Sequence, residues 1–334
     1  MLISTALPAF VSMLLLSGAT SAVAMASVKQ DESLEAGRLA YETGEYDKAA
    51  RDLQHAAAAN PQNGEIHLLL AKTYYETHQH DAAIASAEKA VAFEPQNSRY
   101  HEWLGRAYGA KAEHASWFAA LSLAKKTRKE FARAVELDER NFAARQALIE
   151  FDCSAPAIAG GGEDKARPEI ETLAALDVAE GHFAAGNCRR QKKDFAVADV
   201  EFTKAIESHP KSADLIYDIG DYAVKRGQAE RLLAVADEGE KVTPADPRGN
   251  FYRAVALVLE NDRLAEAERL LREYLKRAPV RDNFPRPSQA REWLGRLYEA
   301  QGNRQAALDE YEEALKLEPK NKSAREALQR LKKS

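Results

Sequence analysis

The chain repeats itself every 34 residues, and this period constrains its fold more than any other feature. Pro61 and Pro95 are one period apart, and so are Pro210 and Pro244. A period of this length is typical of stacked supersecondary units, each too small to bury its own apolar face. Such an array grows by adding units, which accounts for 334 residues without a single large core. The sequence therefore predicts a solenoid.

Within each unit the apolar residues recur three and four positions apart, which is the spacing of a helix. In the unit 64–97, a first helix carries Leu70 and Tyr74, a turn follows at 78–80, and a second helix leads to Pro95. Proline ends the unit because it cannot continue a helix. The eighth position is small, which lets the two helices pack closely: Gly37, Ala71, Gly105, Gly186, Gly220, Ala254 and Gly295. We therefore predict an all-α fold of antiparallel helix pairs.

The unit at 288–321 carries the fullest pattern: Leu294-Gly295, Tyr298, Ala307, Tyr311, Ala314 and Pro319. In these positions the sequence resembles the tetratricopeptide repeat family. The resemblance covers about residues 30–321. It implies a right-handed α-solenoid whose concave wall, made by the first helices, receives a peptide or a partner protein. It also divides the chain into an N-terminal array at 30–178, a C-terminal array at 179–321 and a capping helix at 322–334.

Ten extra residues interrupt the period in the third unit, within 109–129. We expect them to lengthen its second helix by about two to three turns, with Ser116 near its start. Trp117, Phe118 and Leu121 then form an apolar stripe, with basic residues following at 125–129. Two interpretations of the stripe remain. The segment 155–159 of the fourth unit covers it, which is the interpretation we favour, or it stays open as a partner site.

The fourth unit, 142–178, is degenerate: it keeps a first helix and then breaks into a run that contains three glycines at 160–162. A glycine-rich turn before a helix can bind phosphate. Here the Lys-Ser/Thr pair of a P-loop is missing, and Glu163 and Asp164 follow where an anion would lie. We interpret the run as a flexible turn between helices.

Residues 1–26 differ from the rest of the chain because none of them is charged. The apolar stretch 6–16 is followed by two small-x-small patterns of the kind that signal peptidase cleaves, at 22–24 and 24–26. We therefore expect a cleaved signal peptide, a mature chain that begins near Met25 or Ser27, and a periplasmic or secreted protein without membrane insertion. An uncleaved membrane anchor is the alternative, although polar and glycine residues interrupt the ~20 apolar residues that a span requires.

The two cysteines, Cys153 and Cys188, fall on the first helices of the fourth and fifth units. Neighbouring first helices run parallel in such arrays, so we expect the two residues to lie near each other. A disulfide further requires Cα atoms within about 7 Å, which depends on the register of the helices. The bond itself is therefore left open by the sequence.

By the resemblance, positions 2, 5, 9, 12 and 13 of each unit face the concave side. Side chains there carry both charges with aromatic residues between them, a composition that suits a polypeptide ligand. Together with the two aromatic residues of the insertion, the candidate partner-binding residues are Arg38, Tyr41, Lys72, Tyr75, Arg106, Trp117, Phe118, Phe183, Arg190, Tyr217 and Arg296.

Other kinds of chemistry have little support in the sequence. Charges of both signs are interleaved along a chain of net charge −5. We find neither the basic stripe of a nucleic-acid-binding protein nor a basic face for a membrane surface. His78, His80 and Asp81 could ligate a metal, but the spacing identifies no further ligand. We expect no enzyme activity, no cofactor and no metal.

The sequence thus favours a protein–protein interaction scaffold in the cell envelope, which binds a peptide or partner protein in its concave groove. A constitutive, non-catalytic subunit of a larger envelope assembly is the alternative, and a hydrolase or metal-dependent enzyme is a third. A reversible peptide reader should be a monomer with an open groove, whereas a constitutive subunit should co-purify with its partner.

Overall fold

The computed structural model describes residues 32–279, 281 and 283–333, and these residues form helices and connecting turns, with no strand among them. The predicted leader at 1–26 and the start of the first unit lie outside the described residues. A helical segment at 32–42 comes first. It is followed by α2 (Tyr46–Ala59), α3 (Gly64–Glu76), α4 (His80–Phe93), α5 (Ser98–Glu113), α6 (Trp117–Leu137), α7 (Phe142–Ser154), the 3-10 turn η1 (Ala157–Ala159), α8 (Glu163–Leu176), α9 (Val178–Gln191), α10 (Phe195–Glu207), α11 (Ala213–Arg226), α12 (Ala229–Val242), α13 (Arg248–Leu259), α14 (Leu264–Arg277), α15 (Pro287–Ala300), α16 (Arg304–Leu317) and α17 (Lys322–Lys333).

The helices pair as the period predicts. From α3 on, each odd-numbered helix up to α15 is the first helix of a unit and packs against the even-numbered helix that follows it. Helices α3, α5, α7 and α11 begin at the residues predicted to open their units, and α9, α13 and α15 begin within one residue of them. The prediction of an all-α solenoid is confirmed.

The small eighth position allows the close helix packing that the sequence predicts. At Gly186 an added Cβ would lie 2.6 Å from the ring of Phe202, and at Gly295 it would lie 2.6 Å from the ring of Tyr311. In both cases the ring belongs to the second helix of the same unit. At Gly220 the ring in the way is Tyr252, 2.8 Å from the added Cβ, and it comes from the next unit. Each aromatic ring occupies the space that the missing side chain leaves.

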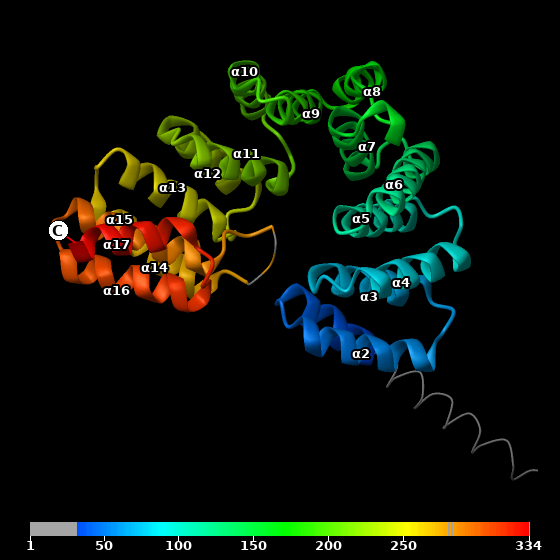
Figure 1. Cartoon of the computed structure of the whole chain (residues 1–334), viewed down its shortest axis with the longest axis horizontal. Helices are drawn as coiled ribbons and strands as arrows, with labels where there is room; N and C mark the ends of the chain where they lie inside the picture. Colours follow the sequence, from blue (N-terminus) through cyan, green and yellow to red (C-terminus); the bar gives the residue numbers. More distant parts are fainter. Residues whose placement is uncertain (1–31, 280, 282, 334) are drawn as a thin grey trace, which may run out of the picture.

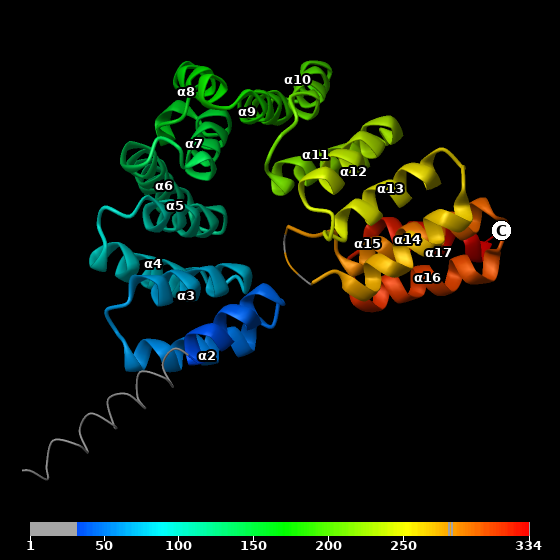
Figure 2. The same cartoon turned by 180° about the vertical axis from the view of Figure 1, so that it is seen from behind.

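The units follow one another around a nearly closed ring (Figures 1 and 2). In Figure 1, α5, α7 and α9 lie toward the inside of the ring and their partners α6, α8 and α10 toward the outside. The loop between α14 and α15 reaches back to the first unit, where the guanidinium of Arg281 lies 5.8 Å from the centre of the Tyr41 ring. The concave side of the array therefore faces the inside of this ring.

The hydrophobic core is continuous in the C-terminal half and divided in the N-terminal half. One cluster of buried side chains runs from Phe183 to Ala324. The fourth unit belongs to a separate, smaller cluster around Ile149 and Leu173, which also includes Ala184 of α9. The core is therefore divided here into two clusters that meet at α9.

Polar and covalent links join the helices of the fourth unit to one another and to their neighbours. Arg128 of α6 donates two hydrogen bonds, of 2.8 and 3.0 Å, to the fully buried carboxylate of Asp152 in α7. Arg145 of α7 pairs with Glu169 of α8. Cys153 and Cys188 form a disulfide between α7 and α9, with their Cα atoms 5.4 Å apart. The predicted proximity of the cysteines is confirmed, and the bond that the sequence left open is present.

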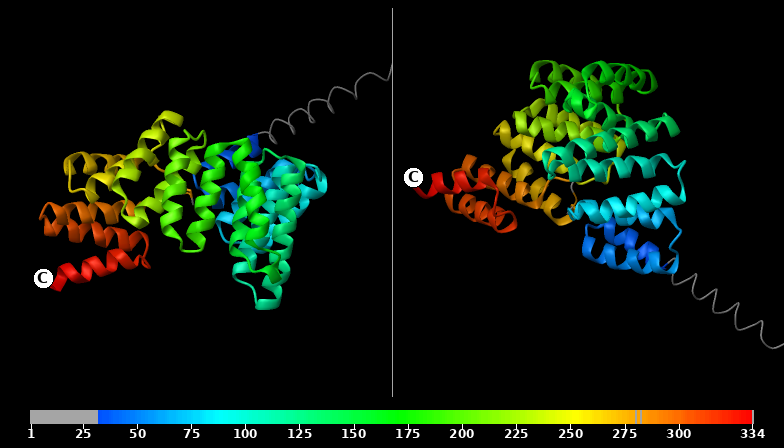
Figure 3. Two further views of the ribbon diagram at one scale, coloured as in Figure 1. Left: turned by 90° about the horizontal axis from the view of Figure 1, so that it is seen from above. Right: turned by 45° about the vertical axis from the view of Figure 1, so that its right-hand side comes forward.

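The insertion forms a long helical hairpin. Helices α5 and α6 have 16 and 21 residues, whereas α3 and α4 of the preceding unit have 13 and 14. Ser116 is the residue before the first turn of α6, as predicted. The left view of Figure 3 shows this hairpin, in teal, extending beyond the neighbouring helices.

The interpretation that segment 155–159 covers the apolar stripe is wrong. Trp117 is 67% exposed and Phe118 is 83% exposed. Segment 155–159 contains η1, and η1 packs against α6. The ion pair between Arg128 and Asp152 holds the end of α7 against the middle of α6, about three turns beyond Trp117. The segment that leaves α7 is therefore too far along α6 to reach the tip of the hairpin.

Candidate functional site

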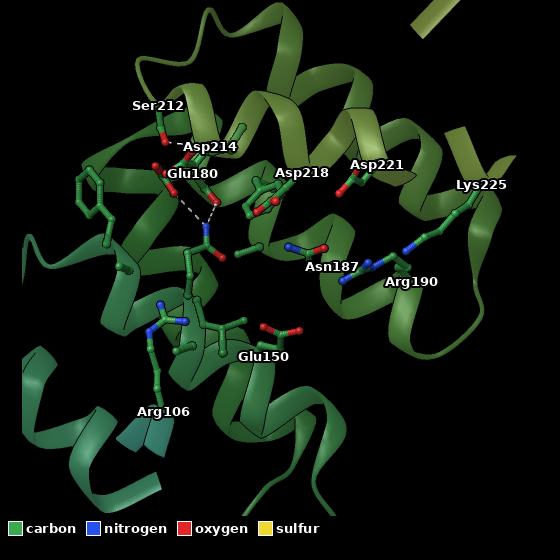
Figure 4. Close-up of a pocket in the computed structure, with 18 residues that line it drawn as sticks. Arg106, Glu150, Glu180, Asn187, Arg190, Ser212, Asp214, Asp218, Asp221 and Lys225 are labelled. Carbon is green, nitrogen blue, oxygen red and sulfur yellow. Dashed lines mark hydrogen bonds between the residues drawn. The ribbon is translucent and has the colours of Figure 1, made fainter. Parts of the chain in front are cut away.

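A cavity of about 560 Å³ opens on the concave side of the array, between α5, α7, α9 and α11 (Figure 4). Its lining comes from these four first helices and from Ser212 immediately before α11. Pockets that bind ligands in proteins have volumes of about 300–1,000 Å³. The size and the position of the cavity make it the candidate site.

Helical periodicity directs the polar side chains of α11 into the cavity. Asp214, Asp218, Asp221 and Lys225 follow one another at intervals of four, three and four residues, so they share one face of the helix. The opposite face, which includes Ile219, is in the core. On α9 the same spacing puts three residues into the cavity: Phe183, Asn187 and Arg190.

Three carboxyl groups of the cavity, those of Asp218, Asp221 and Glu180, are in an environment that favours their neutral form. Burial in the cavity and the negative charges of Asp221 and Asp214 together raise the pKa of Asp218 to about 7. The side chain remains open to solvent, because it lies at the bottom of a concave surface rather than inside the core. Burial also raises the pKa of Asp221 and of Glu180, although Tyr252 and Gln146 donate hydrogen bonds of 2.8 and 3.0 Å to them.

Positive charge is present at two places in the cavity. Arg190 and Lys225, each in the last turn of its helix, lie together in Figure 4, and Arg106 lies on the other side. Nε of Arg190 is buried and has no hydrogen-bond partner in the described part of the chain. Asn187 lies between the acidic residues of α11 and Arg190 (Figure 4). The cavity therefore combines hydrogen-bonding groups with separated negative and positive charges.

Sequence comparisons agree with the period of the chain. A family profile described as tetratricopeptide repeat matches residues 40–107, and a second profile with the same description matches residues 288–321. The chain contains tetratricopeptide repeats. A search among curated proteins finds no match.

The fold is also found among solved structures. The chain is similar to yeast Tom70 with 16% identity and a TM-score of 0.57, over 91% of this chain and 63% of the Tom70 chain. It is similar to a chain of the APC/C hetero-tetramer Cut9–Hcn1 with 13% identity and a TM-score of 0.49, over 86% of this chain and 52% of that one. MamA has 23% identity and a TM-score of 0.40, over 52% and 93% of the two chains. The likeness to Tom70 shows the fold alone.

Three of the predicted partner-binding residues line the cavity between the tetratricopeptide repeats: Arg106, Phe183 and Arg190. Two others lie near Arg106, around the indole ring of Trp103 in the same helix. Nζ of Lys72 is 4.8 Å from the centre of this ring, the guanidinium of Arg106 is 5.5 Å from it, and the Tyr75 ring meets it edge-on at 5.7 Å. The indole therefore joins the second and third repeats along the concave wall.

The remaining predicted residues lie elsewhere. Arg38 pairs with Glu65 at 3.5 Å, and Tyr41 is buried beneath Arg281 at the closure of the ring. Arg296 pairs with Glu292 in the last repeat. Trp117 and Phe118 are exposed at the tip of the hairpin formed by α5 and α6, outside the cavity.

The prediction that Tyr217 lines the groove is wrong. The side chain is 2% exposed and stacks on Tyr252, with ring centres 5.5 Å apart. The guanidinium of Arg248 also lies over the Tyr217 ring, 4.4 Å from its centre. Arg248 comes from the next repeat. Position five, which faces the groove in other units, is therefore covered at Tyr217 by a neighbouring unit.

Two groove residues, Trp103 and Asp218, were not predicted from the sequence. Both occupy position six of their units, which was not among the positions assigned to the concave side. Position six follows position two by four residues and precedes position nine by three, so it lies on the same helical face. Trp293 occupies the same position in the last repeat, where Arg296 lies 4.4 Å from its ring. The helical spacing itself was the signal that could have identified these residues.

The histidines singled out in the sequence lie at the turn between α3 and α4. The His80 ring stacks on His114 at 5.2 Å and lies 6.1 Å from His78, while Lys111 pairs with Asp81. In the described ranges, no three or more His, Cys, Asp or Glu side chains are grouped so that they could hold a metal ion. None of the described helices is long and apolar enough to span a membrane.

The raised pKa of Asp218 predicts a pH-dependent effect on stability. The folded chain holds this proton up to about pH 7, whereas the unfolded chain releases it near pH 3.8. Stability therefore falls as the pH rises between these values. We expect Asp218→Asn to raise the melting temperature at pH 8 and to leave it unchanged at pH 4. Asp309→Asn, on the exposed side of α16, should show no such difference, and equal effects at both pH values would contradict the prediction.

Proposed function

We propose that this chain is a protein–protein interaction scaffold of the cell envelope, whose concave cavity binds an extended segment of a partner polypeptide. The observation that carries the proposal is the lining of the cavity by four successive first helices. Asp218, Asn187 and Arg190 point into it (Figure 4). No hydrogen bond to the carboxylate of Asp218 or to the amide of Asn187 is found within the described ranges, and Nε of Arg190 lacks a partner as well.

A polypeptide satisfies such a lining better than a compact ligand does. Its backbone supplies donors and acceptors at regular intervals, and its side chains can carry either charge. Complementary charges across an interface increase the rate of association and fix the register of the partner. Tetratricopeptide repeats occur in general in non-catalytic scaffolds, and we include the absence of catalysis in the proposal.

Two features support the proposed location in the envelope. The uncharged leader at 1–26 has the pattern of an export signal. The disulfide between Cys153 and Cys188 is of a kind that forms in oxidising compartments and is rare in the cytosol of most organisms. The mass of the protein purified from its host tests this part, because export with cleavage removes about the first 24 to 26 residues.

Site-specific photo-crosslinking in the host tests the binding function. A photoreactive phenylalanine analogue at position 187 should form adducts with another polypeptide, because Asn187 lies in the cavity. The same analogue at position 200 is the matched control, since Val200 is exposed on α10, a second helix. Adducts from position 200 but not from 187 would contradict a groove-bound partner.

Removal of two positive charges identifies the contribution of the cavity. Arg190→Gln together with Lys225→Gln should strongly reduce the adducts at position 187 and change the melting temperature little, because no ion pair of either residue is found in the described ranges. The alternative of a constitutive subunit predicts that adducts still form when the purified protein is illuminated without renewed mixing with a partner. A reversible reader predicts that adducts no longer form when the sample is diluted before illumination.

A further inference from the structure

The tip of the hairpin formed by α5 and α6 exposes two aromatic side chains that no other part of the described chain covers. Trp117 and Phe118 open α6 and are 67% and 83% exposed. Large aromatic side chains at adjacent positions are rarely left in solvent without a function. The hairpin extends beyond its neighbours in the left view of Figure 3, so its tip is accessible from outside the ring.

Positive charge continues from the aromatic pair along the exposed face of α6. From Trp117 to Lys129 the helix contains no Asp or Glu, while Lys125, Lys126 and Lys129 are all exposed. Phe118, Lys125 and Lys129 are spaced by seven and four residues, so they share one helical face. The opposite face, with Thr127 and Phe131, is buried against the array. The mixture of positive and negative charges over the whole chain does not reveal this stretch without acidic residues.

The lysines of this face are available for an external partner. Arg128 is used inside the protein, where it pairs with Asp152. For Lys125 and Lys129, by contrast, no ion pair is found in the part of the chain that the structure describes, and Lys126 lies 5.0 Å from the Tyr108 ring without an acidic partner there. Glu113 and the pair of Lys111 with Asp81 lie across the turn from the start of α6. The exposed face of α6 is therefore positively charged.

We propose that this face of α6, with the aromatic pair at its start, docks the scaffold on an anionic lipid membrane. Aromatic side chains prefer the interface between lipid and water, and a helix with aromatic residues beside Lys and Arg is typical of peripheral membrane binding. A protein partner would need a preformed pocket for two adjacent rings on a protruding tip, whereas a lipid interface accepts them without one. Each Lys near an anionic surface strengthens binding by about fivefold.

Vesicle sedimentation tests the proposal with the chain that begins at Ser27. This chain lacks the apolar leader and keeps every residue that the structure describes, from 32 on. We expect it to sediment with phosphatidylcholine vesicles that contain about 30% phosphatidylglycerol, and not with pure phosphatidylcholine, because binding depends on the surface charge. High salt should release it. Failure to sediment with the anionic vesicles would overturn the proposal.

Matched variants assign the binding to α6. Lys125→Glu with Lys129→Glu should weaken binding to the anionic vesicles by at least about tenfold. Lys211→Glu with Lys320→Glu makes the same change in net charge at exposed lysines elsewhere, and should have a much smaller effect. Equal losses in the two pairs would show attraction by overall charge, and would overturn the assignment to α6.

The aromatic pair has its own test. Vesicles with brominated acyl chains should quench part of the tryptophan emission, and Trp117→Ser with Phe118→Ser should remove both this quenching and most of the binding. Val200→Ser with Leu317→Ser, at exposed apolar positions of α10 and α16, should leave both unchanged. Unquenched emission would overturn the proposal. Binding to soluble polyglutamate that depends on Lys125 and Lys129 in the same way would indicate an acidic protein partner, and would overturn it as well. The crosslinks from the concave cavity do not depend on this outcome.

Discussion

Replacing Cys153 and Cys188 by serine is expected to lower the free energy of unfolding by about 3–4 kcal/mol. The disulfide joins residues that are 35 positions apart, so it closes a long loop and restricts the unfolded chain. Urea denaturation without reductant measures the loss as a shift of the unfolding midpoint. Dithiothreitol should cause the same shift in the unmodified chain and none in the double variant.

The size of this effect depends on where the bond lies. It connects α7 to α9, between the small cluster of the fourth unit and the continuous core that starts at Phe183. Cys153 packs against the edge of the small cluster, so the bond lies where the two clusters meet. Free thiols in the protein purified from its host without reductant, or a midpoint insensitive to dithiothreitol, would contradict the prediction.

Replacing Arg248 by methionine is expected to cost about 3–5 kcal/mol, because the change leaves a buried negative charge without its partner. The guanidinium is buried and donates hydrogen bonds to Asp246 and to Asp214 at 2.7 Å, and to the carbonyl oxygen of Asn283 at 3.1 Å. The side chain of Asp246 is itself buried. Arg248 also stacks between the rings of Tyr217 and Phe284, at 4.4 and 4.5 Å.

Arg253 offers a control in the same helix. It pairs with Asp237 at 2.9 Å and with Glu240 at 3.0 Å, but all three side chains are in contact with solvent. Ion pairs of this kind contribute about 0–1 kcal/mol. Arg253→Met should therefore shift the unfolding midpoint much less than Arg248→Met, and similar shifts would show that burial does not determine the cost.

The repeated parts of the fold could be predicted from the sequence because the same physical requirement recurs in every unit. Small residues such as Gly186 and Gly295 predict where two helices cross, and Ser116 predicts the start of the lengthened α6. Each of these signals depends on neighbours within one unit. The helices and their pairing within each unit were therefore predictable.

The features that could not be predicted depend on contacts between units. Tyr217 is covered by Arg248 of the next repeat, and Trp117 stays open because Arg128 holds the fourth unit at another place along α6. In the candidate site, the raised pKa of Asp218 depends on Asp214 and Asp221 and on the surrounding helices. A periodic pattern gives the face of a helix, but not which neighbouring side chain lies across it.

The contact of Arg281 with Tyr41 has a kinetic consequence for any ligand of the array. Because this contact closes the circuit of repeats, a chain lying inside can leave sideways only when the contact opens, and otherwise has to slide out along the axis. A cation–π contact contributes about 0.5–1 kcal/mol at an exposed site and about 2 kcal/mol when it is desolvated, so this half-buried contact favours the closed circuit by about a few-fold to thirtyfold. Short peptides should then dissociate at the same rate from the unmodified chain and from the Arg281→Ala variant. Partners with a folded domain at each end should remain bound longer than short peptides, and should dissociate faster from Arg281→Ala than from the unmodified chain.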